Sequence, residues 1–398
     1  MAFKLVYTAT SPLFLNFLRR QIGFLREEGF RICIVCSPGE QLQKFVEQEQ
    51  VPGYGVEMPR RITPIKDLVA LSQLCSILRR VRPHLVHANT PKGGLLGMVA
   101  SYLCRVPVRI YHVHGLPFMS ASGGKRRLLR WTEKISCRLA HSVLCVSHSV
   151  REVMVRERLC PPEKVRVLAS GSVQGVDADE RFNPDRFPDT LRHQLRANLG
   201  IPDKAVVVGY AGRIVRDKGM EELAQAWQML QAEYPRLYLL LVGDFEPQDP
   251  VSDNARKTLT SAPRAIITGW VEDTAPYYAT MDILTLPSYR EGFPNAPLEA
   301  AAMGIPVIAT NIPGCTDAVV DGITGTLVPP HDASALAHAI ERYIRQPLLR
   351  SQHGRAGRER VLTQFRQEVI WHALLDHYRS LLEQRGLSSD DLLHGAPQ

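Results

Sequence analysis

The sequence predicts an α/β protein built on two parallel sheets. Short β-branched runs alternate with helical stretches along the whole chain, which is typical of βαβ units. With 45% hydrophobic and 22% charged residues the composition is that of a globular protein, which excludes collagen, a small disulfide scaffold and wholesale disorder. The length of 398 residues is sufficient for two or three domains.

Each half of the chain contains six candidate strands. In the first half they are 4–9, 31–36, 85–88, 108–113, 143–146 and 165–168. In the second half they are 206–210, 238–242, 265–268, 283–286, 307–309 and 325–328. Six strands in each half are the number expected of two Rossmann-like domains.

A polar connector with two prolines, residues 181–188, separates the predicted domains. We expect the first domain at 1–188 and the second at 189–367. A helix at about 368–385 is a candidate for packing back on the first domain, and residues 386–398 are expected to form a flexible tail. Two such domains facing each other would bind ligands in a cleft, at the C-terminal ends of their strands.

The net charge of +8 is divided unevenly along the chain. Residues 1–190 carry 28 basic and 16 acidic residues, whereas residues 191–398 carry 20 and 24. This asymmetry indicates that the first half faces an anionic partner, either a nucleic acid or a membrane. Few aromatic residues lie between the basic runs and no nucleic-acid-binding module is recognised, so we expect no nucleic acid.

One predicted helix, 125–139, combines basic residues with Trp131 and an apolar stripe. The stripe consists of Leu128, Leu129, Ile135 and Leu139. A basic helix with a tryptophan is typical of an element that lies in a membrane interface. The alternative is a solvated helix whose apolar face packs on the first sheet.

The cysteines and the N-terminus indicate the cytoplasm. The eight cysteines are scattered, and Cys33 and Cys36 lie on a predicted strand, where residues three apart point to opposite faces. We therefore expect this pair in the core, without a shared metal or bridge. The N-terminus lacks the charged and then apolar segments of a signal peptide, and no apolar run approaches the roughly 20 residues of a membrane span.

Two cations follow the strand at 206–210. Arg213 and Lys218 lie between Gly212 and Gly219, before a predicted helix. A guanidinium fork and an ammonium at the end of a strand suit a diphosphate. The alternative is that both are solvated surface cations.

A second loop follows the strand at 283–286. It contains Glu291, and Pro297 is expected in the first turn of a helix that ends before Gly304 and carries Glu299 in the same turn. Such carboxylates could accept hydrogen bonds from the hydroxyls of a hexose and a ribose. Alternatively, Glu299 serves only the helix dipole.

Glu291 and Glu299, with seven residues between them, and the Gly212-Arg213…Lys218-Gly219 segment together resemble the retaining glycosyltransferases of the GT-B fold, in the large family 4. The resemblance extends to Val113-His114-Gly115 and to residues 146–149 and 171–177, so it covers nearly the whole chain. It implies an α/β GT-B fold and an enzyme that transfers a sugar from a nucleotide sugar.

The resemblance also implies roles for single residues. Arg213 and Lys218 would neutralise the leaving diphosphate, Glu291 would contact hydroxyls of the donor sugar, and Glu299 would bind the ribose. His114 would lie beside the reacting centre, although His112 shares its face of the strand and the relative roles of the two stay open. Further donor-binding residues would be Gly212, Gly292, Phe293, Pro294 and Asn295.

In such retaining enzymes the acceptor attacks the face that the leaving group occupies, and the leaving phosphate takes the proton of the acceptor. A retaining glycosidase, the alternative use of two carboxylates, fits the adjacent cations poorly. No metal and no other cofactor is expected, since Asp177 and Asp179, although spaced like a metal motif, are interpreted as part of a turn. The first-strand loop, 8–14, lacks the Gly-Gly pair that many relatives have, which leaves the acceptor site open.

Residues 90–110 and 115–118 resemble a subgroup that builds capsule, exopolysaccharide and protein-linked glycans. The resemblance implies a polyprenyl-diphosphate-linked acceptor, a UDP-linked hexose or N-acetylhexosamine as donor, and a peripheral position at the inner face of the cytoplasmic membrane. Two alternatives stay open: a GT-B transferase with a soluble acceptor, and an inactive protein that binds sugar nucleotides.

Overall fold

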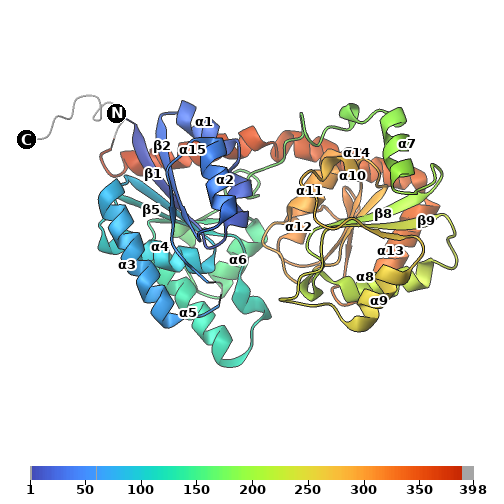
Figure 1. Ribbon diagram of the computed structural model, residues 1–398, viewed down its shortest axis with the longest axis horizontal. Helices are drawn as coiled ribbons and strands as arrows, with labels where there is room; N and C mark the ends of the chain where they lie inside the picture. Colours follow the sequence, from blue (N-terminus) through green and yellow to red (C-terminus); the bar gives the residue numbers. More distant parts are fainter. Residues whose placement is uncertain (1, 60, 388–398) are drawn as a thin grey trace, which may run out of the picture. The chain divides into compact units, whose positions relative to one another are not determined.

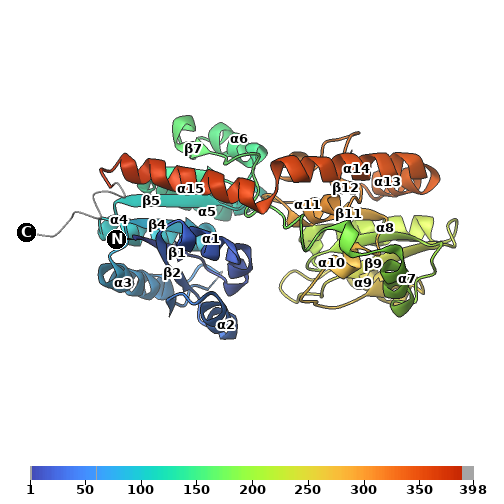
Figure 2. The same cartoon turned by 90° about the horizontal axis from the view of Figure 1, so that it is seen from above.

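A computed structural model describes residues 2–59 and 61–387 of the chain. The chain divides into two compact units. The first unit comprises the chain up to Gln174 together with the C-terminal helix from Glu368, and the second comprises Gly175–Gln367. Figures 1 and 2 show a parallel sheet flanked by helices in each unit.

The sheet of the first unit has the strand order β3-β2-β1-β4-β5-β6-β7, with every pair parallel. The strands are β1 (Phe3–Thr8), β2 (Phe30–Cys36), β3 (Gly53–Gly55), β4 (Leu85–Asn89), β5 (Val108–Val113), β6 (Ser142–Cys145) and β7 (Val165–Arg166). Strand β3 was not predicted, because its sequence Gly-Tyr-Gly has no β-branched residue. It is a short edge strand.

Helices cover both faces of this sheet. The α-helices are α1 (Gln21–Glu27), α2 (Glu40–Glu49), α3 (Pro64–Val81), α4 (Pro91–Leu103), α5 (Gly123–Leu139), α6 (His148–Arg156) and α15 (Gln367–Glu383). Short 3₁₀ helices are η1 (Pro12–Leu18), η2 (Pro117–Ser120) and η3 (Pro162–Lys164).

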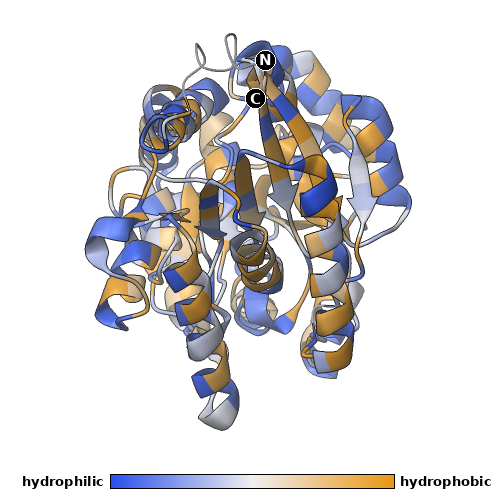
Figure 3. Cartoon of the chain, turned by 90° about the vertical axis from the view of Figure 1, so that its left-hand side faces the viewer, coloured by the Kyte–Doolittle hydropathy of each residue, from blue (hydrophilic) through white to orange (hydrophobic). Residues whose placement is uncertain are grey.

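The strands contribute alternate residues to two separate cores. Val6 and Val86 pack with α3, α4 and α5, whereas their neighbours Leu5 and Leu85 pack with α1, α2 and α15. This alternation is the period of two expected of strands buried on both faces. Figure 3 shows the result as largely orange strands between helices that alternate orange and blue.

The sheet of the second unit has the order β10-β9-β8-β11-β12-β13, again with every pair parallel. The strands are β8 (Val206–Ala211), β9 (Leu237–Val242), β10 (Ala265–Ile267), β11 (Ile283–Leu286), β12 (Val307–Thr310) and β13 (Gly325–Val328). The helices are α7 (Asp189–Asn198), α8 (Met220–Leu230), α9 (Asp253–Ser261), α10 (Ala275–Tyr278), α11 (Asn295–Ala302), α12 (Cys315–Ala318), α13 (Ala333–Arg345) and α14 (Pro347–Gln364), with the 3₁₀ helices η4 (Pro184–Arg186) and η5 (Arg216–Lys218). The prediction of two Rossmann-like α/β domains is confirmed.

The division between the units lies earlier than the boundary expected at 188, because the connector packs on the second unit. The guanidinium of Arg181 donates to Asp273 at 2.9 Å, and the Phe182 ring lies edge-on to Tyr278 with centroids 5.8 Å apart. The predicted linker is therefore part of the second unit.

Helix α15 belongs to the first unit although it follows the second in the chain. Leu374, Leu375 and Leu382 are buried against the first sheet. The hydroxyls of Tyr378 and Tyr7 are hydrogen-bonded at 2.9 Å. The expected tail at 386–398 lies outside the described residues from 388 onward.

All eight cysteines are free thiols, and burial raises the pKa of both Cys33 and Cys36 to about 12. None of the helices in the described residues combines the length and the apolarity needed to traverse a bilayer.

Candidate functional site

In the second unit the site predicted to bind the donor lies where the strand order reverses. Strands β8 and β11 are neighbours, yet the chain leaves them toward opposite sides of the sheet. Ligands of open α/β sheets bind at such a switch point, beyond the C-terminal ends of the strands. The loop that follows β8 contains Gly212, Arg213 and Lys218, and the loop that follows β11 contains Glu291.

The two loops are held together by a backbone hydrogen bond, an ion pair and a close approach at a glycine. The amide of Tyr289 donates to the carbonyl of Asp217 at 2.9 Å, and the Arg290 guanidinium pairs with the Asp217 carboxylate at 2.9 Å. Gly219 has a φ of +71°, and a β-carbon there would lie 2.0 Å from the carbonyl oxygen of Pro287. Only glycine permits this approach. The sequence predicted both loops, but not the residues that join them.

Lys218 and Glu291 form an ion pair. Their side chains are mostly buried, with 19% and 10% of their surfaces exposed. Because a buried charge without a partner is costly, each group depends on the other in the absence of a ligand. The structure thus brings together the predicted diphosphate cation and the predicted sugar-binding carboxylate.

Arg213 is placed differently, since about half of its side chain is exposed. Its guanidinium pairs with Glu246 at 2.9 Å, and its carbonyl accepts a hydrogen bond from the Tyr210 hydroxyl at 2.6 Å. The backbone of Arg213 is therefore anchored, while the side chain lies at the rim. Glu246 was not predicted, since it lies after β9 in a segment without a recognisable motif.

Residues 292–295 lead into helix α11. Gly292 and Pro294 are buried, Pro294 is the N-cap, and Phe293 packs on Phe365 with ring centroids 5.6 Å apart. The Oδ1 atom of Asn295, the first helical residue, is buried and has no hydrogen-bond partner among the described residues. Beside the free amides of a helix start, this oxygen is available to a polar ligand.

Glu299 was expected in the first turn of its helix, which is wrong. Helix α11 begins at Asn295, two residues before Pro297, so Glu299 lies in the second turn. The Tyr278 hydroxyl donates to Glu299 Oε2 at 2.9 Å, and burial raises the pKa of the Glu299 carboxyl. Glu299 is therefore held by a side chain of α10, and its role is not that of a first-turn acid.

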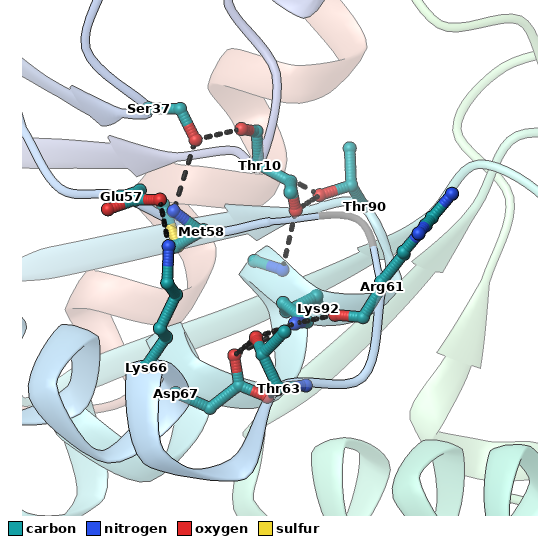
Figure 4. Close-up of polar contacts among 11 residues, drawn as sticks. Thr10, Ser37, Glu57, Met58, Arg61, Thr63, Lys66, Asp67, Thr90 and Lys92 are labelled. Atoms are coloured by element: carbon teal, nitrogen blue, oxygen red, sulfur yellow. Dashed lines mark hydrogen bonds and ion pairs between the residues drawn. The ribbon is translucent and has the colours of Figure 1, made fainter. Parts of the chain in front are cut away.

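In the first unit the loops after β1 and β4 meet at the corresponding switch point. Thr10 lies in the loop after β1, which lacks the Gly-Gly pair that many relatives have at this place. Figure 4 shows the contacts of Thr10. Its hydroxyl is 2.7 Å from that of Thr90 and accepts from the amide of Gly93 at 3.0 Å. A β-carbon on Gly93 would lie 3.0 Å from the Thr10 nitrogen. The small residue that permits close packing is thus on α4, and not on the β1 loop.

Lys92, in the first turn of α4, is enclosed by polar groups (Figure 4). Its ammonium pairs with Asp67 at 2.8 Å and donates to the Thr63 hydroxyl at 3.3 Å. The lysine is therefore engaged in joining α4 to the start of α3.

His114 follows β5, and His112 lies within it. Their rings are on the same face of the strand, with centroids 4.4 Å apart, as the alternation predicted. His112 is buried and bonded to His87 at 3.1 Å, whereas His114 is only partly buried and bonded to Asn89 at 2.9 Å. The two histidines thus belong to different hydrogen-bond systems.

Asp177 and Asp179, the two acids that are spaced like a metal motif, are engaged in other contacts. Asp179 pairs with Arg366 at 2.5 Å, and Asp177 accepts from the amide of Glu180 at 3.2 Å, as in a turn. Within residues 2–59 and 61–387, no three or more His, Cys, Asp or Glu side chains are grouped so that they could hold a metal.

The chain matches two family models. One, described as glycosyl transferase 4-like domain, matches residues 16–171, and the other, glycosyl transferases group 1, matches residues 205–346. The chain is 31% identical over 382 residues to the capsular polysaccharide biosynthesis glycosyltransferase CapM of Staphylococcus aureus, covering 96% of this chain and 98% of the relative. It is 26% identical over 345 residues to an Escherichia coli UDP-Gal:alpha-D-GlcNAc-diphosphoundecaprenol alpha-1,3-galactosyltransferase, covering 85% and 87%.

Solved structures agree in fold. Anabaena Alr3699/HepE in complex with UDP superposes with a TM-score of 0.77 at 20% identity, covering 96% of this chain and all of the other. Sucrose-phosphate synthase from Thermosynechococcus elongatus gives a TM-score of 0.76 at 23% identity, covering 96% and 100%.

Two Rossmann-like units that match these structures along nearly the whole chain define a protein of the GT-B class. Within that class, the chain belongs to the group 1, family 4-like glycosyltransferases and is a glycosyltransferase.

Proposed function

We propose that this glycosyltransferase moves a sugar, a hexose or an N-acetylhexosamine, from a UDP-linked donor to a saccharide carried on a polyprenyl diphosphate, with retention of the anomeric configuration and without a metal. The observation that carries the proposal is the pairing of Lys218 with Glu291 at the switch point of the second unit, where Lys218 shares the loop after β8 with Arg213. The names of the two relatives, a capsular polysaccharide transferase and a diphosphoundecaprenol galactosyltransferase, support it.

The reaction breaks the bond between the anomeric carbon and the diphosphate oxygen, and it forms a bond from that carbon to an acceptor hydroxyl. Negative charge grows on the diphosphate as its bond breaks. Fixed cations at that position stabilise the transition state more than the ground state. Arg213 and Lys218 supply this charge, so no metal ion is required. The acceptor proton passes to the departing phosphate oxygen, and the reaction needs no protein nucleophile.

The donor takes the place of the contacts that the site makes by itself. The diphosphate replaces Glu291 as the partner of Lys218, which leaves the Glu291 carboxylate free to accept hydrogen bonds from sugar hydroxyls. The buried Oδ1 of Asn295 and the backbone of residues 292–294 complete this surface. Glu299, fixed by Tyr278, accepts from the ribose hydroxyls.

The acceptor side is supported by the position of the positive charge. Residues 61–139 contain 14 basic and two acidic residues, whereas the rest of residues 1–190 contains 14 of each. The whole excess of positive charge in the first half therefore lies in the stretch that forms α3, α4 and α5. These helices pack on one face of the first sheet. An anionic membrane that carries a lipid diphosphate complements such a face.

Exposed apolar side chains lie on the same layer. On α5, Leu128 and Trp131 are exposed, while Leu129, Ile135 and Leu139 are at least half buried. An unpredicted patch lies at the start of α3, where Ile65 and Leu68 are 80% and 68% exposed. Ile62 and Val69 belong to it as well. Because α3 begins at the C-terminal edge of a parallel sheet, the patch at its start lies at the edge where the strands end, whereas Trp131 lies in the middle of α5.

Membrane binding can be tested with vesicles and matched charge variants. Four exposed cations of α5 (Lys125, Arg127, Lys134 and Arg138) are replaced by Gln, and the control replaces four exposed cations of the second unit (Lys204, Lys257, Arg342 and Arg355). We expect the first set to weaken binding to anionic vesicles about a hundredfold or more and the control set to have little effect. Equal losses in both sets, or equal binding to neutral vesicles, would refute a specific membrane face.

The donor and its metal requirement can be tested together in a thermal-shift panel of nucleotide sugars, with and without EDTA. A bound donor raises the melting temperature, because it binds only the folded state. We expect UDP sugars to stabilise the protein equally in both conditions. Retention is read from the anomeric configuration of the product by NMR; an inverted product would overturn that part of the proposal.

A further inference from the structure

Asn89 ends strand β4, and its side chain is buried between two carbonyl groups and an imidazole ring. Its amide nitrogen donates to the carbonyl of His87 at 3.1 Å and to that of Thr8 at 3.4 Å. Its oxygen lies 2.9 Å from Nε2 of His114. Only 1% of Asn89 is exposed, so solvent does not compete for these contacts.

The two carbonyl groups determine which way the carboxamide points. If the oxygen and nitrogen of Asn89 exchanged places, the oxygen would face the carbonyl oxygens of Thr8 and His87, and three acceptors would meet without a donor. A buried acceptor without a donor costs about 1–3 kcal/mol. The oxygen of Asn89 therefore faces His114, and since it can only accept, Nε2 of His114 must carry the proton.

The remaining nitrogen of His114 then holds a lone pair. In a neutral imidazole with its proton on Nε2, Nδ1 is an acceptor. None of the residues that the structure describes forms a hydrogen bond to this Nδ1. The ring is held by Phe14, edge-on at 5.0 Å between centroids, and by His112 at 4.4 Å. Burial lowers the pKa of His114 to about 3, which agrees with a neutral ring.

The neighbouring histidines do not share this arrangement. His87 Nδ1 is bonded to the Tyr378 hydroxyl at 2.5 Å, and its Nε2 to His112 at 3.1 Å. Tyr378 is in turn bonded to Tyr7, whose hydroxyl donates to Gln21 Oε1 at 3.3 Å. This chain of side chains ends inside the unit, at a buried glutamine. Gln21 therefore offers a control, because it is a buried amide whose oxygen accepts from Tyr7.

We propose that Asn89 is a positioning residue that fixes His114 in the neutral form protonated at Nε2, so that Nδ1 accepts a hydrogen bond from a substrate hydroxyl. Held in this form, His114 orients a hydroxyl group and contributes no positive charge toward a phosphate. The need for a substrate hydroxyl rests on the proposed function, whereas the protonation state of His114 does not.

The protonation state can be measured directly by NMR on protein labelled with ¹⁵N-histidine, with the His114 signals identified by their loss in His114→Phe. We expect a protonated Nε2 whose proton is protected from exchange with water, and an Nδ1 with the shift of an unprotonated nitrogen. Asn89→Leu and Asn89→Ala should remove the protection, and Gln21→Ala should retain it. A proton on Nδ1 in the wild type, or protection that survives both Asn89 variants, would overturn the proposal.

Kinetics then separate this inference from the proposed function. Asn89→Leu is expected to lower kcat about tenfold at saturating donor in the wild-type background and to have no further effect in a His114→Ala background. Equal losses in both backgrounds would show that Asn89 does not act through His114. If the wild type transfers no sugar from any nucleotide donor, the proposed function fails, while the NMR result still decides the protonation state.

Discussion

The ammonium of Lys218 pairs with the carboxylate of Glu291, although 73 positions separate the two residues in the chain. Strands β8 and β11 place them side by side, and the pair is mostly shielded from solvent. In the proposed reaction Lys218 binds the diphosphate and Glu291 binds the sugar hydroxyls, but in this structure each is the counter-ion of the other. Stability and activity should therefore respond differently when one or both are changed.

Removing one partner of this pair should destabilise the second unit more than removing both. Lys218→Met leaves the Glu291 carboxylate with little solvent, and the loss of one buried partner typically costs about 3–5 kcal/mol. The double variant Lys218→Met/Glu291→Gln should recover most of that loss. Chemical denaturation of the four proteins gives the coupling free energy. Additive effects would mean that the pair is solvated.

Arg213→Ala should leave stability nearly unchanged and reduce turnover by about a hundredfold or more, since it removes one fixed cation from the leaving diphosphate. Its pair with Glu246 is about half exposed, and such pairs contribute little to stability. The matched control is Arg216→Ala, in the same loop, because the side chain of Arg216 is 67% exposed. Steady-state kinetics should separate the two variants. A similar turnover in both would remove Arg213 from the proposed mechanism.

Glu299→Gln should weaken donor binding by about 10- to 100-fold, because hydrogen bonds to a charged acceptor contribute about 1.5–3 kcal/mol. Isothermal titration with the donor identified in the thermal-shift panel measures this loss. Tyr278→Phe retains the carboxylate and removes only the hydroxyl that holds it at 2.9 Å, so a smaller loss is expected. If Tyr278→Phe is the more harmful change for binding, Glu299 acts through packing and does not contact the ribose.

Glu133 predicts a pH dependence of stability. It is buried on α5, accepts from the Tyr111 hydroxyl at 2.7 Å, and burial raises its pKa to about 7. A carboxyl whose pKa is higher in the folded than in the unfolded protein stabilises the fold below its unfolded pKa of about 4.5. That stabilisation is lost as the pH rises through 7.

Glu133→Gln, which cannot ionise, should therefore gain stability relative to the wild type between pH 5 and pH 8, by about 2 kcal/mol. Urea unfolding at the two pH values measures the difference. Glu163→Gln, an exposed residue of the same unit, serves as control and should show no such change. If the difference in unfolding free energy between the wild type and Glu133→Gln is the same at both pH values, Glu133 is hydrated.

The fold was predictable because its signal is local. Strands such as 108–113 and 283–286 were predicted at the bounds that the structure has, since each is a short apolar run between turn residues. Strand β3 was missed, because a strand of three residues with two glycines has no such pattern. The expected start of α11 is too late, since Pro297 predicts the first turn, whereas the structure has Pro294 at the N-cap and begins the helix at Asn295.

The candidate site was predictable only as far as its motifs extend. Lys218 and Glu291 follow strands and were recognised, but Glu246, Tyr278 and Asn89 were not, because each acts through a partner far away in the sequence. The apolar patch at the start of α3 was missed for another reason. In sequence, Ile65 and Leu68 have the spacing of a helix face that packs inward, and only the structure shows that this face is bare.

Helix α15 gives the first unit a discontinuous origin. Tyr378 and Leu374 complete a core that begins with Leu5 and Tyr7, so the second unit is inserted into the first along the chain. During translation the face of the first sheet that α15 shares with α1 and α2 stays incompletely covered until α15 has left the ribosome. The second unit, whose residues are contiguous, can finish folding before the first. A cell that degrades unfinished chains would thus never accumulate a folded first unit without a second unit already made.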